Sequence, residues 1–483
     1  MINSKMILNV MGSLLLIETA MLLLCSGISF FYQEDDLYSF LITAGITVVC
    51  GLLLYFYGRK GSKELNRKDG YIIVTFSWIT VSTFGMLPFY LSGYIPSITD
   101  AFFESISGFT STGSSILDNI EEFPHALLFW RSLTQWIGGL GIVFFTIAVL
   151  PFLGVSGVQL FAAEATGLTH EKVHPRIGIT AKWIWLIYLG LTLAEVILLY
   201  IGDMSLFDSV CHSLATSSTG GFSTKQSSIA FYNSRYIEYI ITLFMFLSGI
   251  NFSLYILFIS GRFKKLREEE ELKLYIASVL FFSAIVTISL YFTNDESLEY
   301  SIRTALFQIV SIHTSTGFAT ADYMTWQPIA WGVLLIVMIT GACAGSTSGG
   351  IKCIRLLILG KITKNEFKRI LHPNAVLPVR VNKTVIPNTI QSTVLAFLFL
   401  YFTFMFVSIL VFQELGLELD EAVGIAISSI SNTGPGLGKF GPAFSWSALP
   451  DVIKWWASFL MLLGRLELFS VLLIFTPRFW KKS

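Results

Sequence analysis

Residues 100–114 read Asp-Ala-Phe-Phe-Glu-Ser-Ile-Ser-Gly-Phe-Thr-Ser-Thr-Gly-Ser, a moderately apolar stretch that runs into a polar Thr-Gly loop. The stretch is too short to cross a bilayer, which takes about 20 residues of helix. The same arrangement returns three times, and each copy lies between two long apolar segments. The sequence therefore predicts four units, each made of helix, half-helix, Thr-Gly loop and helix. The loop glycines are Gly113, Gly220, Gly317 and Gly434, separated by 107, 97 and 117 residues.

The backbone of these loops can coordinate a cation. Irregular backbone after a half-crossing is tolerated in a membrane only where it is buried in protein or lines a water-filled cavity. Four such loops can meet on one axis, and each half-helix then directs the negative end of its dipole towards that axis. Glycine lets the neighbouring carbonyl groups turn inward and replace the water shell of a cation. No carboxylate lies in the four-residue core of any loop, which favours a weakly hydrated monovalent cation over Ca²⁺ or Mg²⁺.

Each loop contributes three residues to the predicted selectivity filter. The threonines before the glycines add carbonyl and hydroxyl oxygens as ligands for such a cation. Thr-Gly alone is a weak signal, since it also occurs at 166–167 and 340–341, and ordinary extracellular turns are the alternative. A turn, however, requires no apolar half-helix before it. The predicted filter residues are Ser111, Thr112, Gly113, Ser218, Thr219, Gly220, Ser315, Thr316, Gly317, Asn432, Thr433 and Gly434.

The composition places this chain in lipid. Of its 483 residues, 54% are apolar and 13% are charged, against about 25% charged in ordinary soluble domains. The mean hydropathy is +0.69. This composition excludes intrinsic disorder, a secreted disulfide scaffold and a free nucleic-acid-binding protein. The five cysteines are widely spaced and contain no C-x-x-C pair, so we expect neither a disulfide framework nor a metal site from them.

Ten long apolar segments predict the fold class. We expect an all-α integral membrane protein with ten spanning helices, in which two accessory helices precede four helix–pore loop–helix repeats around a pseudo-fourfold pore. The expected division is 1–70 for the accessory helices, then 71–181, 182–270, 271–387 and 388–483 for the repeats. The segments are 6–32, 37–57, 71–93, 126–153, 182–201, 235–260, 271–293, 327–359, 388–413 and 450–477.

Basic residues predict the orientation. With the N-terminus inside, 25 of the 32 lysines and arginines fall on inside segments, whereas acidic groups such as Glu34-Asp35-Asp36 fall outside. Both termini are therefore expected in the cytoplasm. The first apolar run is too long for a signal peptide and has no small-residue cleavage site, so an uncleaved membrane anchor is expected.

The eighth segment contains a glycine-rich break. Four glycines within ten residues should interrupt a helix near the middle of the membrane. We interpret the break as a flexible loop that crosses the pore below the filter and acts as a gate; a small-residue helix-packing face is the alternative. A phosphate-binding P-loop is excluded, because Ile351 stands where the lysine must follow the glycine. The predicted gate residues of this segment are Gly341, Gly345, Ser346, Thr347, Ser348, Gly349 and Gly350.

Arg465 is the second predicted gate component. It lies 13 residues before Arg478, which is about 20 Å along a continuous helix and too deep for easy snorkelling. A buried arginine in a membrane marks function by default, and facing the pore it would raise a barrier to cations. A structural pair with Glu467 is the alternative, and the two roles are compatible.

Two histidines raise the question of an intramembrane hydrolase. His212 precedes Ser213, and His313 precedes Thr314-Ser315. Neither has an acidic partner placed to orient it, so we do not expect catalysis.

At these motifs the chain resembles the Trk/Ktr/HKT superfamily of potassium transporters, and within it the bacterial TrkH branch. The resemblance covers essentially the whole chain, and the two additional N-terminal helices favour TrkH over the shorter Ktr subunits. It rests on residues 103–113, Arg131-Ser-Leu-Thr-Gln-Trp-Ile-Gly-Gly-Leu-Gly141, 218–223, 314–318, 341–352, 432–435 and Leu463-Gly-Arg-Leu-Glu467.

The resemblance implies K⁺ uptake across the bacterial inner membrane through a gated, channel-like pore. It further implies a homodimer and a cytosolic RCK/KTN-type, TrkA-like regulatory subunit that binds ATP or NAD(H), which the basic segment from Lys361 to Lys383 could dock. No organic cofactor and no nucleic acid is expected on this chain. A Na⁺- or H⁺-coupled symporter with the same filter remains an alternative, as does, in a different class, a membrane scaffold that transports nothing.

Overall fold

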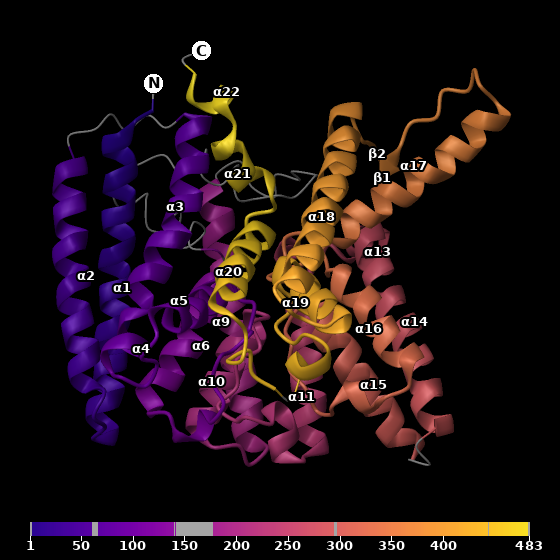
Figure 1. Cartoon of the computed structure of the whole chain (residues 1–483). Helices are drawn as coiled ribbons and strands as arrows, with labels where there is room; N and C mark the ends of the chain where they lie inside the picture. The colour runs from indigo at the N-terminus through magenta and orange to yellow at the C-terminus, as the bar shows by residue number, and fades with distance from the viewer. Residues whose placement is uncertain are drawn as a thin grey trace.

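The computed structural model describes residues 2–59, 66–139, 141, 177–293, 297–442 and 444–481. It is helical throughout, apart from one short hairpin of two-residue strands, β1 (Arg380–Val381) and β2 (Thr384–Val385). Long helices lie side by side, and both termini lie at the same end of the molecule (Figure 1). Large apolar side chains remain exposed on these helices: Phe292 is 80% and Phe399 71% exposed. Such apolar flanks are the surface expected against lipid, so the all-α membrane class is supported.

Two long helices precede the repeated part of the chain, and their ends match the predicted accessory segments closely. They are α1 (Ser4–Tyr32) and α2 (Leu37–Gly58). The first repeat contains α3 (Arg67–Gly85), α4 (Leu87–Leu91), α5 (Ile98–Phe109), η1 (Ile120–Glu122) and α6 (His125–Gly139). The second contains α9 (Ile177–Ile201), α10 (Leu206–Ser217), η3 (Ser228–Tyr232), α11 (Arg235–Ser248), α12 (Phe252–Ile259) and α13 (Phe263–Glu268).

The third repeat carries the hairpin, and its α17 projects away from the bundle (Figure 1). It contains α14 (Glu270–Thr293), α15 (Leu298–His313), η4 (Tyr323–Thr325), α16 (Pro328–Ile339), α17 (Cys353–Leu371), β1 and β2. The fourth contains α18 (Asn388–Glu414), α19 (Leu419–Ser431), η5 (Gly438–Phe440), α20 (Asp451–Arg465), α21 (Phe469–Leu472), η6 (Leu473–Phe475) and α22 (Pro477–Trp480).

The four short helices α5, α10, α15 and α19 begin in the same way. A side chain before each helix satisfies the otherwise unpaired N–H groups of its first turn, and an acidic residue in that turn complements the positive end of the helix dipole. Three of these helices use serine, and α19 uses a glutamate capping box. The caps are Ser97, Ser205, Ser297 and Glu418, and the acidic residues are Asp100, Asp208, Glu299, Asp420 and Glu421.

Two of the helices that follow a Thr-Gly loop bend within their predicted segments. Segment 235–260 was expected to be one span, but it bends by 94° between α11 and α12. Segment 450–477 likewise bends by 110° after α20. The glycine-rich break of segment 327–359 is present, between α16 and α17. Segment 126–153 begins with α6, which ends at Gly139; its remainder lies almost entirely outside the described residues.

These breaks change the count of spanning helices. Among the described residues, six helices are long and apolar enough to cross a membrane, or eight if each bent pair is one span. The count of ten is therefore not reproduced by continuous helices. The physical reason is that hydropathy reports the apolar length of a segment, and a bend inside protein leaves that length unchanged.

Candidate functional site

The four Thr-Gly loops share one backbone conformation. In each, two residues separated by one position have left-handed φ angles, and the second of the two is a glycine. The N–H of the residue between them bonds back to a carbonyl five residues earlier, over 2.8–3.0 Å. Two left-handed residues this close together are costly unless one of them is a glycine. The pairs are Ser111 with Gly113, Thr219 with Gly221, Ser315 with Gly317, and Asn432 with Gly434.

The second loop is therefore displaced by one residue from its predicted register. The sequence motif aligned Ser218, Thr219 and Gly220 with the other loops, but the backbone aligns Thr219, Gly220 and Gly221. Ser218 still has right-handed helical angles and donates its N–H to the carbonyl of Leu214. Because two glycines are adjacent here, the half-helix can extend by one residue and the second glycine can take the left-handed position.

The loops touch one another in a closed cycle. A Cβ on Gly113 would overlap the carbonyl oxygen of Gly220, so the first loop abuts the second. A Cβ on Gly221 would likewise overlap the carbonyl of Thr316, and one on Gly317 that of Thr433. Gly434 completes the cycle, because its Cβ would lie 2.7 Å from the carbonyl oxygen of Thr112. Four segments separated by about a hundred residues each thus form one ring of backbone, which we call the loop ring.

A pocket of about 80 Å³ opens on the loop ring. All four left-handed glycines line it: Gly113, Gly221, Gly317 and Gly434. No carboxylate is among its described lining residues, which include backbone and hydroxyl oxygens and the basic side chains of Arg131 and Lys225. The absence of carboxylates disfavours a hard divalent cation.

The threonine hydroxyls of the loop ring are already engaged. Those of Thr112 and Thr316 lie 2.7 Å from the hydroxyls of the threonines two residues earlier, and that of Thr433 lies 2.8 Å from Ser431 Oγ. Thr219 donates its hydroxyl to the carbonyl of Ser218 at 2.6 Å. The hydroxyl groups therefore brace the loops, and the carbonyl oxygens are the groups best placed to contact an ion.

Two amide side chains brace the loops: Gln135 from α6, for which the sequence analysis had predicted no role, and Asn432 from the fourth loop itself. Gln135 donates from Nε2 to the carbonyl of Gly220 at 2.7 Å and accepts the N–H of Phe222 at 3.0 Å. Asn432 donates from Nδ2 to Thr112 Oγ1 at 3.0 Å, which joins the fourth loop to the first. Amides and hydroxyls in a mostly apolar helix carry no periodic signal.

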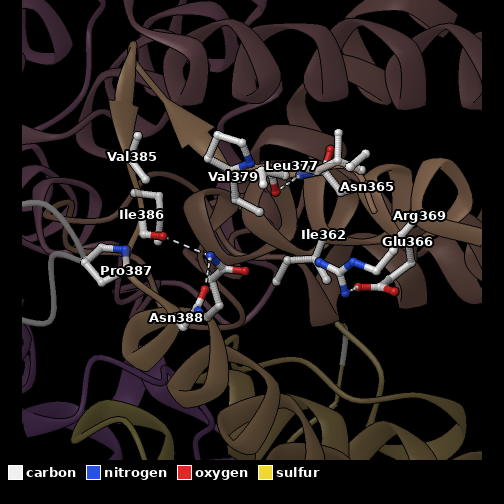
Figure 2. A pocket seen from close by; sticks show the side chains of 14 residues that line it. Ile362, Asn365, Glu366, Arg369, Leu377, Val379, Val385, Ile386, Pro387 and Asn388 are labelled. Atoms are coloured by element: carbon white, nitrogen blue, oxygen red, sulfur yellow. Dashed lines mark hydrogen bonds and ion pairs between the residues drawn. The ribbon is translucent and has the colours of Figure 1, made fainter. Parts of the chain in front are cut away.

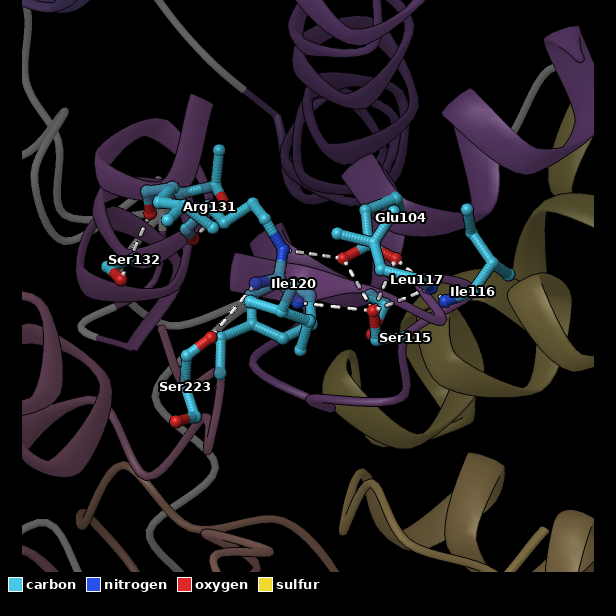
Figure 3. A network of polar contacts seen from close by, with 12 residues as sticks. Glu104, Ser115, Ile116, Leu117, Ile120, Arg131, Ser132 and Ser223 are labelled. Carbon is cyan, nitrogen blue, oxygen red and sulfur yellow. Dashed lines mark hydrogen bonds and ion pairs between the residues drawn. The ribbon is translucent and has the colours of Figure 1, made fainter. Parts of the chain in front are cut away.

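An ion pair supports the first and second loops together (Figure 3). Arg131 Nε lies 2.7 Å from a carboxylate oxygen of Glu104, and each residue is 1% exposed. The guanidinium also donates to the carbonyl of Ser223 at 3.1 Å and to Ser115 Oγ at 3.1 Å. Glu104 in turn accepts the N–H of Ile116 at 3.0 Å. Buried charges are stable only when paired and hydrogen-bonded in this manner.

The segment between α16 and α17 lies against the same ring. Its Gly349 donates its N–H to Ser315 Oγ at 2.6 Å, and a Cβ there would overlap the carbonyl of Ser431. Thr347 Oγ1 donates to the carbonyl of Ser217 at 3.2 Å. We call residues 340–352 the crossing loop, since it contacts the ends of three of the four half-helices. It contains all seven predicted gate residues of the eighth segment.

The crossing loop is folded back on itself. A parallel bridge joins Thr340 to Ile351, and Gly341 donates its N–H to the carbonyl of Ile351 at 2.9 Å. Gly345 and Gly350 have left-handed φ angles of 74° and 67°. Lys352 is also turned into the loop, where its buried Nζ contacts the carbonyl of Ser348 and lies 3.2 Å from Ser348 Oγ.

Arg465 contacts the crossing loop, as the gate assignment requires. It lies at the end of a helix, however, and not within a continuous one as the sequence analysis assumed. It donates to the carbonyl of Thr347 at 2.8 Å and to that of Gly139 at 2.7 Å, and it contacts the carbonyl of Gly138. The depth argument assumed a continuous helix to Arg478 and is wrong, because α20 ends at Arg465 and the chain bends. Its proposed partner Glu467 forms an ion pair with Arg355.

The two histidines make structural contacts. His212 Nε2 lies 3.0 Å from Ser223 Oγ, and its Nδ1 faces the carbonyl of Asp208 at 2.8 Å. His313 Nε2 lies 2.7 Å from Ser278 Oγ, and its Nδ1 faces the carbonyl of Thr340 at 2.7 Å. In both cases a backbone carbonyl stands where a catalytic triad needs a carboxylate.

Comparison with known proteins identifies relatives along the whole chain. A family model for TrkH, described as a cation transport protein, matches residues 37–482. The chain is 37% identical over 482 residues to the Trk system potassium uptake protein TrkH of Escherichia coli strain K12, with 99% of both covered. It is 33% identical over 457 residues to TrkG of the same organism, with 94% of both covered.

A solved structure agrees with the computed fold. The crystal structure of the potassium transporter TrkH from Vibrio parahaemolyticus matches with a TM-score of 0.89 and 33% identity, with 99% of both chains covered. These relatives are named as uptake proteins and transporters, so the hydrolase alternative is not supported. Because the family model and the relatives span nearly all of the sequence, the chain belongs to the TrkH family of cation transport proteins.

Proposed function

We propose that this chain mediates K⁺ uptake through the loop ring, with the ring acting as the selectivity filter. The observation that carries the proposal is the closed cycle in which each left-handed glycine abuts a carbonyl of the next loop. Carbonyl oxygens of residues 111–113, 219–221, 315–317 and 432–434 would replace the hydration shell of the ion. The relatives named as potassium uptake proteins point to K⁺ as the transported ion.

The filter assignment includes one change from the sequence motif. Ser111, Thr112, Gly113, Ser315, Thr316, Gly317, Asn432, Thr433 and Gly434 keep their proposed roles. In the second loop, Thr219, Gly220 and Gly221 take the positions that Ser111, Thr112 and Gly113 hold in the first loop. Ser218 belongs to the end of the half-helix.

The crossing loop and Arg465 form the proposed gate. The loop lies against three half-helix ends, and the guanidinium of Arg465 joins it to the end of α6 through backbone carbonyls. A cation leaving the ring on this side would meet both the loop and the positive charges of Arg465 and Lys352. Displacing the loop would therefore open the path.

The regulatory and assembly proposals concern the end of the molecule that carries the hairpin. Both chain termini and this end are proposed to face the cytoplasm, in the inner membrane. We keep the division into accessory helices 1–70 and pore repeats 71–181, 182–270, 271–387 and 388–483. The chain is proposed to form a homodimer and to bind an RCK/KTN-type nucleotide-binding subunit, for which the Trk system names of the relatives give support.

The region proposed to bind that subunit is basic and accessible. Lys364, Lys368, Arg369, Arg380 and Lys383 are exposed on α17 and the hairpin. A pocket of about 480 Å³ lies among them, between α17 and the residues that lead into α18 (Figure 2). Ile362, Val379 and Ile386 give it an apolar lining.

Ion flux into liposomes tests the filter. The full-length protein should take up ⁸⁶Rb⁺ in preference to ²²Na⁺, and Gly113→Ser or Gly434→Ser should change that preference. Substitution adds a side chain where φ is left-handed and where the next loop is in contact. Unchanged uptake of both ions in both variants would contradict the filter assignment.

The alternative mechanism is coupled symport through the same ring. Flux measured with a K⁺, Na⁺ or H⁺ gradient applied one at a time distinguishes the two. Channel-like conduction needs only the K⁺ gradient, whereas a tightly coupled symporter moves no K⁺ until the second ion is supplied.

A further inference from the structure

Four consecutive glutamates, residues 268–271, lie between the exposed hairpin and the crossing loop. The first three contact the hairpin side. Glu268 pairs with Lys383 at 2.8 Å, and the hydrogen bond and charge of that lysine lower the pKa of Glu268. Glu269 accepts from Asn382 Nδ2 at 2.6 Å, and the N–H of Glu270 donates to Asn382 Oδ1 at 2.9 Å.

Glu270 adds a contact to α17. Its carboxylate forms an ion pair with Lys361, whose Nζ also donates to the carbonyl of Arg380 at 2.6 Å. The hairpin, the first half of α17 and the start of α14 are thereby held together by side chains from a single turn of chain. Movement of the hairpin relative to α14 would break several of these contacts at once.

Glu271 reaches in the opposite direction, to the crossing loop. It is 8% exposed, and its Oε1 accepts the N–H of Ala344 at 2.6 Å and that of Ile354 at 3.0 Å. Ala344 lies before the glycine-rich turn and Ile354 lies after it. One carboxylate oxygen therefore fixes the entry and the exit of the loop relative to each other and to α14.

The two bonds to Glu271 are of the strong kind. One carboxyl oxygen that accepts two backbone N–H groups satisfies both donors, and a buried, low-dielectric site strengthens such hydrogen bonds. Leaving either N–H without its acceptor in a buried site is costly. The loop itself contains Gly345 and Gly350, whose backbone restricts it least. Its position is therefore set largely by contacts from outside, and Glu271 supplies two of them.

We propose that Glu271 is a positioning residue that holds the crossing loop against the loop ring, and that residues 268–271 transmit displacement of the hairpin to that loop. The proposal deepens the gate of the preceding section and rests on it. It identifies the mechanical connection by which a protein bound at the basic hairpin would release the loop. Glu271 is not among the residues that line the 80 Å³ pocket.

Basal ⁸⁶Rb⁺ flux of the full-length protein in liposomes, without any partner, tests the connection. Glu271→Ala should raise that flux at least about tenfold, which corresponds to about 1.4 kcal/mol lost from the held state. Glu271→Gln keeps an acceptor oxygen without the charge and should raise it less. Asn382→Ala should also raise it, because it removes both hairpin contacts of Asn382. Glu414→Gln, a carboxylate change at the exposed end of α18, is the matched control and should leave flux unchanged.

Cys343 provides a second measurement that does not depend on flux. It lies in the crossing loop and is 1% exposed. In a background where the other four cysteines are replaced by serine, a methanethiosulfonate reagent should modify Cys343 faster in the Glu271→Ala and Asn382→Ala variants. The ratio of ⁸⁶Rb⁺ to ²²Na⁺ flux should stay at the wild-type value, since the loop ring is untouched.

The outcomes separate this proposal from the proposed function. Faster labelling of Cys343 in a protein that conducts no ion under any condition would contradict the conduction proposal and leave the role of Glu271 supported. If the wild type conducts, and Glu271→Ala shows the same flux and the same rate of Cys343 labelling as the wild type, the role of Glu271 alone is overturned. If Glu271→Ala fails to fold, Glu271→Gln and Asn382→Ala decide, and wild-type behaviour of both would overturn the proposal.

Discussion

At the residue scale, the adjacent glycines Gly220 and Gly221 are the most informative pair in the chain. Only Gly221 has a left-handed φ, of 79°, and only its Cβ would overlap the backbone of the third loop. At Gly220 the crowding comes from the side chain of Gln135. The other three loops carry threonine at the position of Gly220, so that position tolerates a Cβ if its neighbour moves.

The two glycines should therefore respond differently to substitution. Gly221→Ala should alter K⁺/Na⁺ selectivity or abolish flux, because the left-handed conformation alone costs an L-residue about 1–2 kcal/mol. Gly220→Ala should be milder, because its new Cβ crowds only the side chain of Gln135. The ratio of ⁸⁶Rb⁺ to ²²Na⁺ uptake is the measurement. A more harmful effect at Gly220 than at Gly221 would favour the register of the sequence motif.

The Glu104–Arg131 pair makes a second prediction at this scale. Arg131→Gln should destabilise the protein by about 3–5 kcal/mol, because it leaves the carboxylate of Glu104 buried and unpaired. The double variant with Glu104→Gln should recover much of that loss, since both groups are then neutral. Thermal unfolding in detergent measures the recovery, and purely additive losses would argue against the pairing.

At the element scale, three of the helices that follow the loops are short. α11, α16 and α20 have 14, 12 and 15 residues, each too few to span the hydrocarbon core alone. The chain bends after α11 and α20, and the crossing loop follows α16. The bend after α20 includes two non-glycine residues, Glu467 and Leu468, with left-handed φ angles. Such strain persists only where surrounding contacts enforce it, and Arg465 and Glu467 supply them on either side.

Arg465 should act through geometry as well as charge. Arg465→Ala should raise basal ⁸⁶Rb⁺ flux, because it removes the bonds that join α20 to the crossing loop and to α6. Arg465→Lys should give an intermediate flux, since one ammonium cannot reproduce the planar fork of the guanidinium. Arg478→Ala, an exposed arginine on α22, is the control. Equal flux in all three variants and the wild type would exclude Arg465 from the gate.

At the scale of the whole molecule, the fold combines an apolar exterior with a polar axis. Both termini lie at one end (Figure 1), as an even number of crossings requires. The distribution of lysine and arginine predicts that this end faces the cytoplasm. The basic hairpin region would then be accessible to a soluble regulatory subunit.

Reporter fusions test that orientation. Green fluorescent protein joined after Ser483 should fluoresce, and alkaline phosphatase joined there should be inactive. Phosphatase joined after Thr293, at the end of α14, should be active, because the next segment is predicted to lie outside. The reverse pattern would invert the topology and place the hairpin on the wrong side for a cytosolic partner.

The amino-acid sequence by itself determined the apolar segments, the four half-helices and the glycine-rich break. These features are local, because hydropathy and glycine act within about one helical turn. They were sufficient to predict an all-α membrane protein and its family.

Only the tertiary structure decided the register at Gly221 and the bends after α11 and α20. It also decided which partners the polar side chains contact, namely those of Arg465, Gln135, Arg131, Lys352 and Glu271. Adjacent glycines allow two registers with nearly equal local energy, and the contact with Thr316 selects between them. A bend leaves hydropathy unchanged, and a buried polar side chain gains its partner from a segment up to hundreds of residues away. Such contacts depend on how the four loops close into one ring, which no local stretch of sequence specifies.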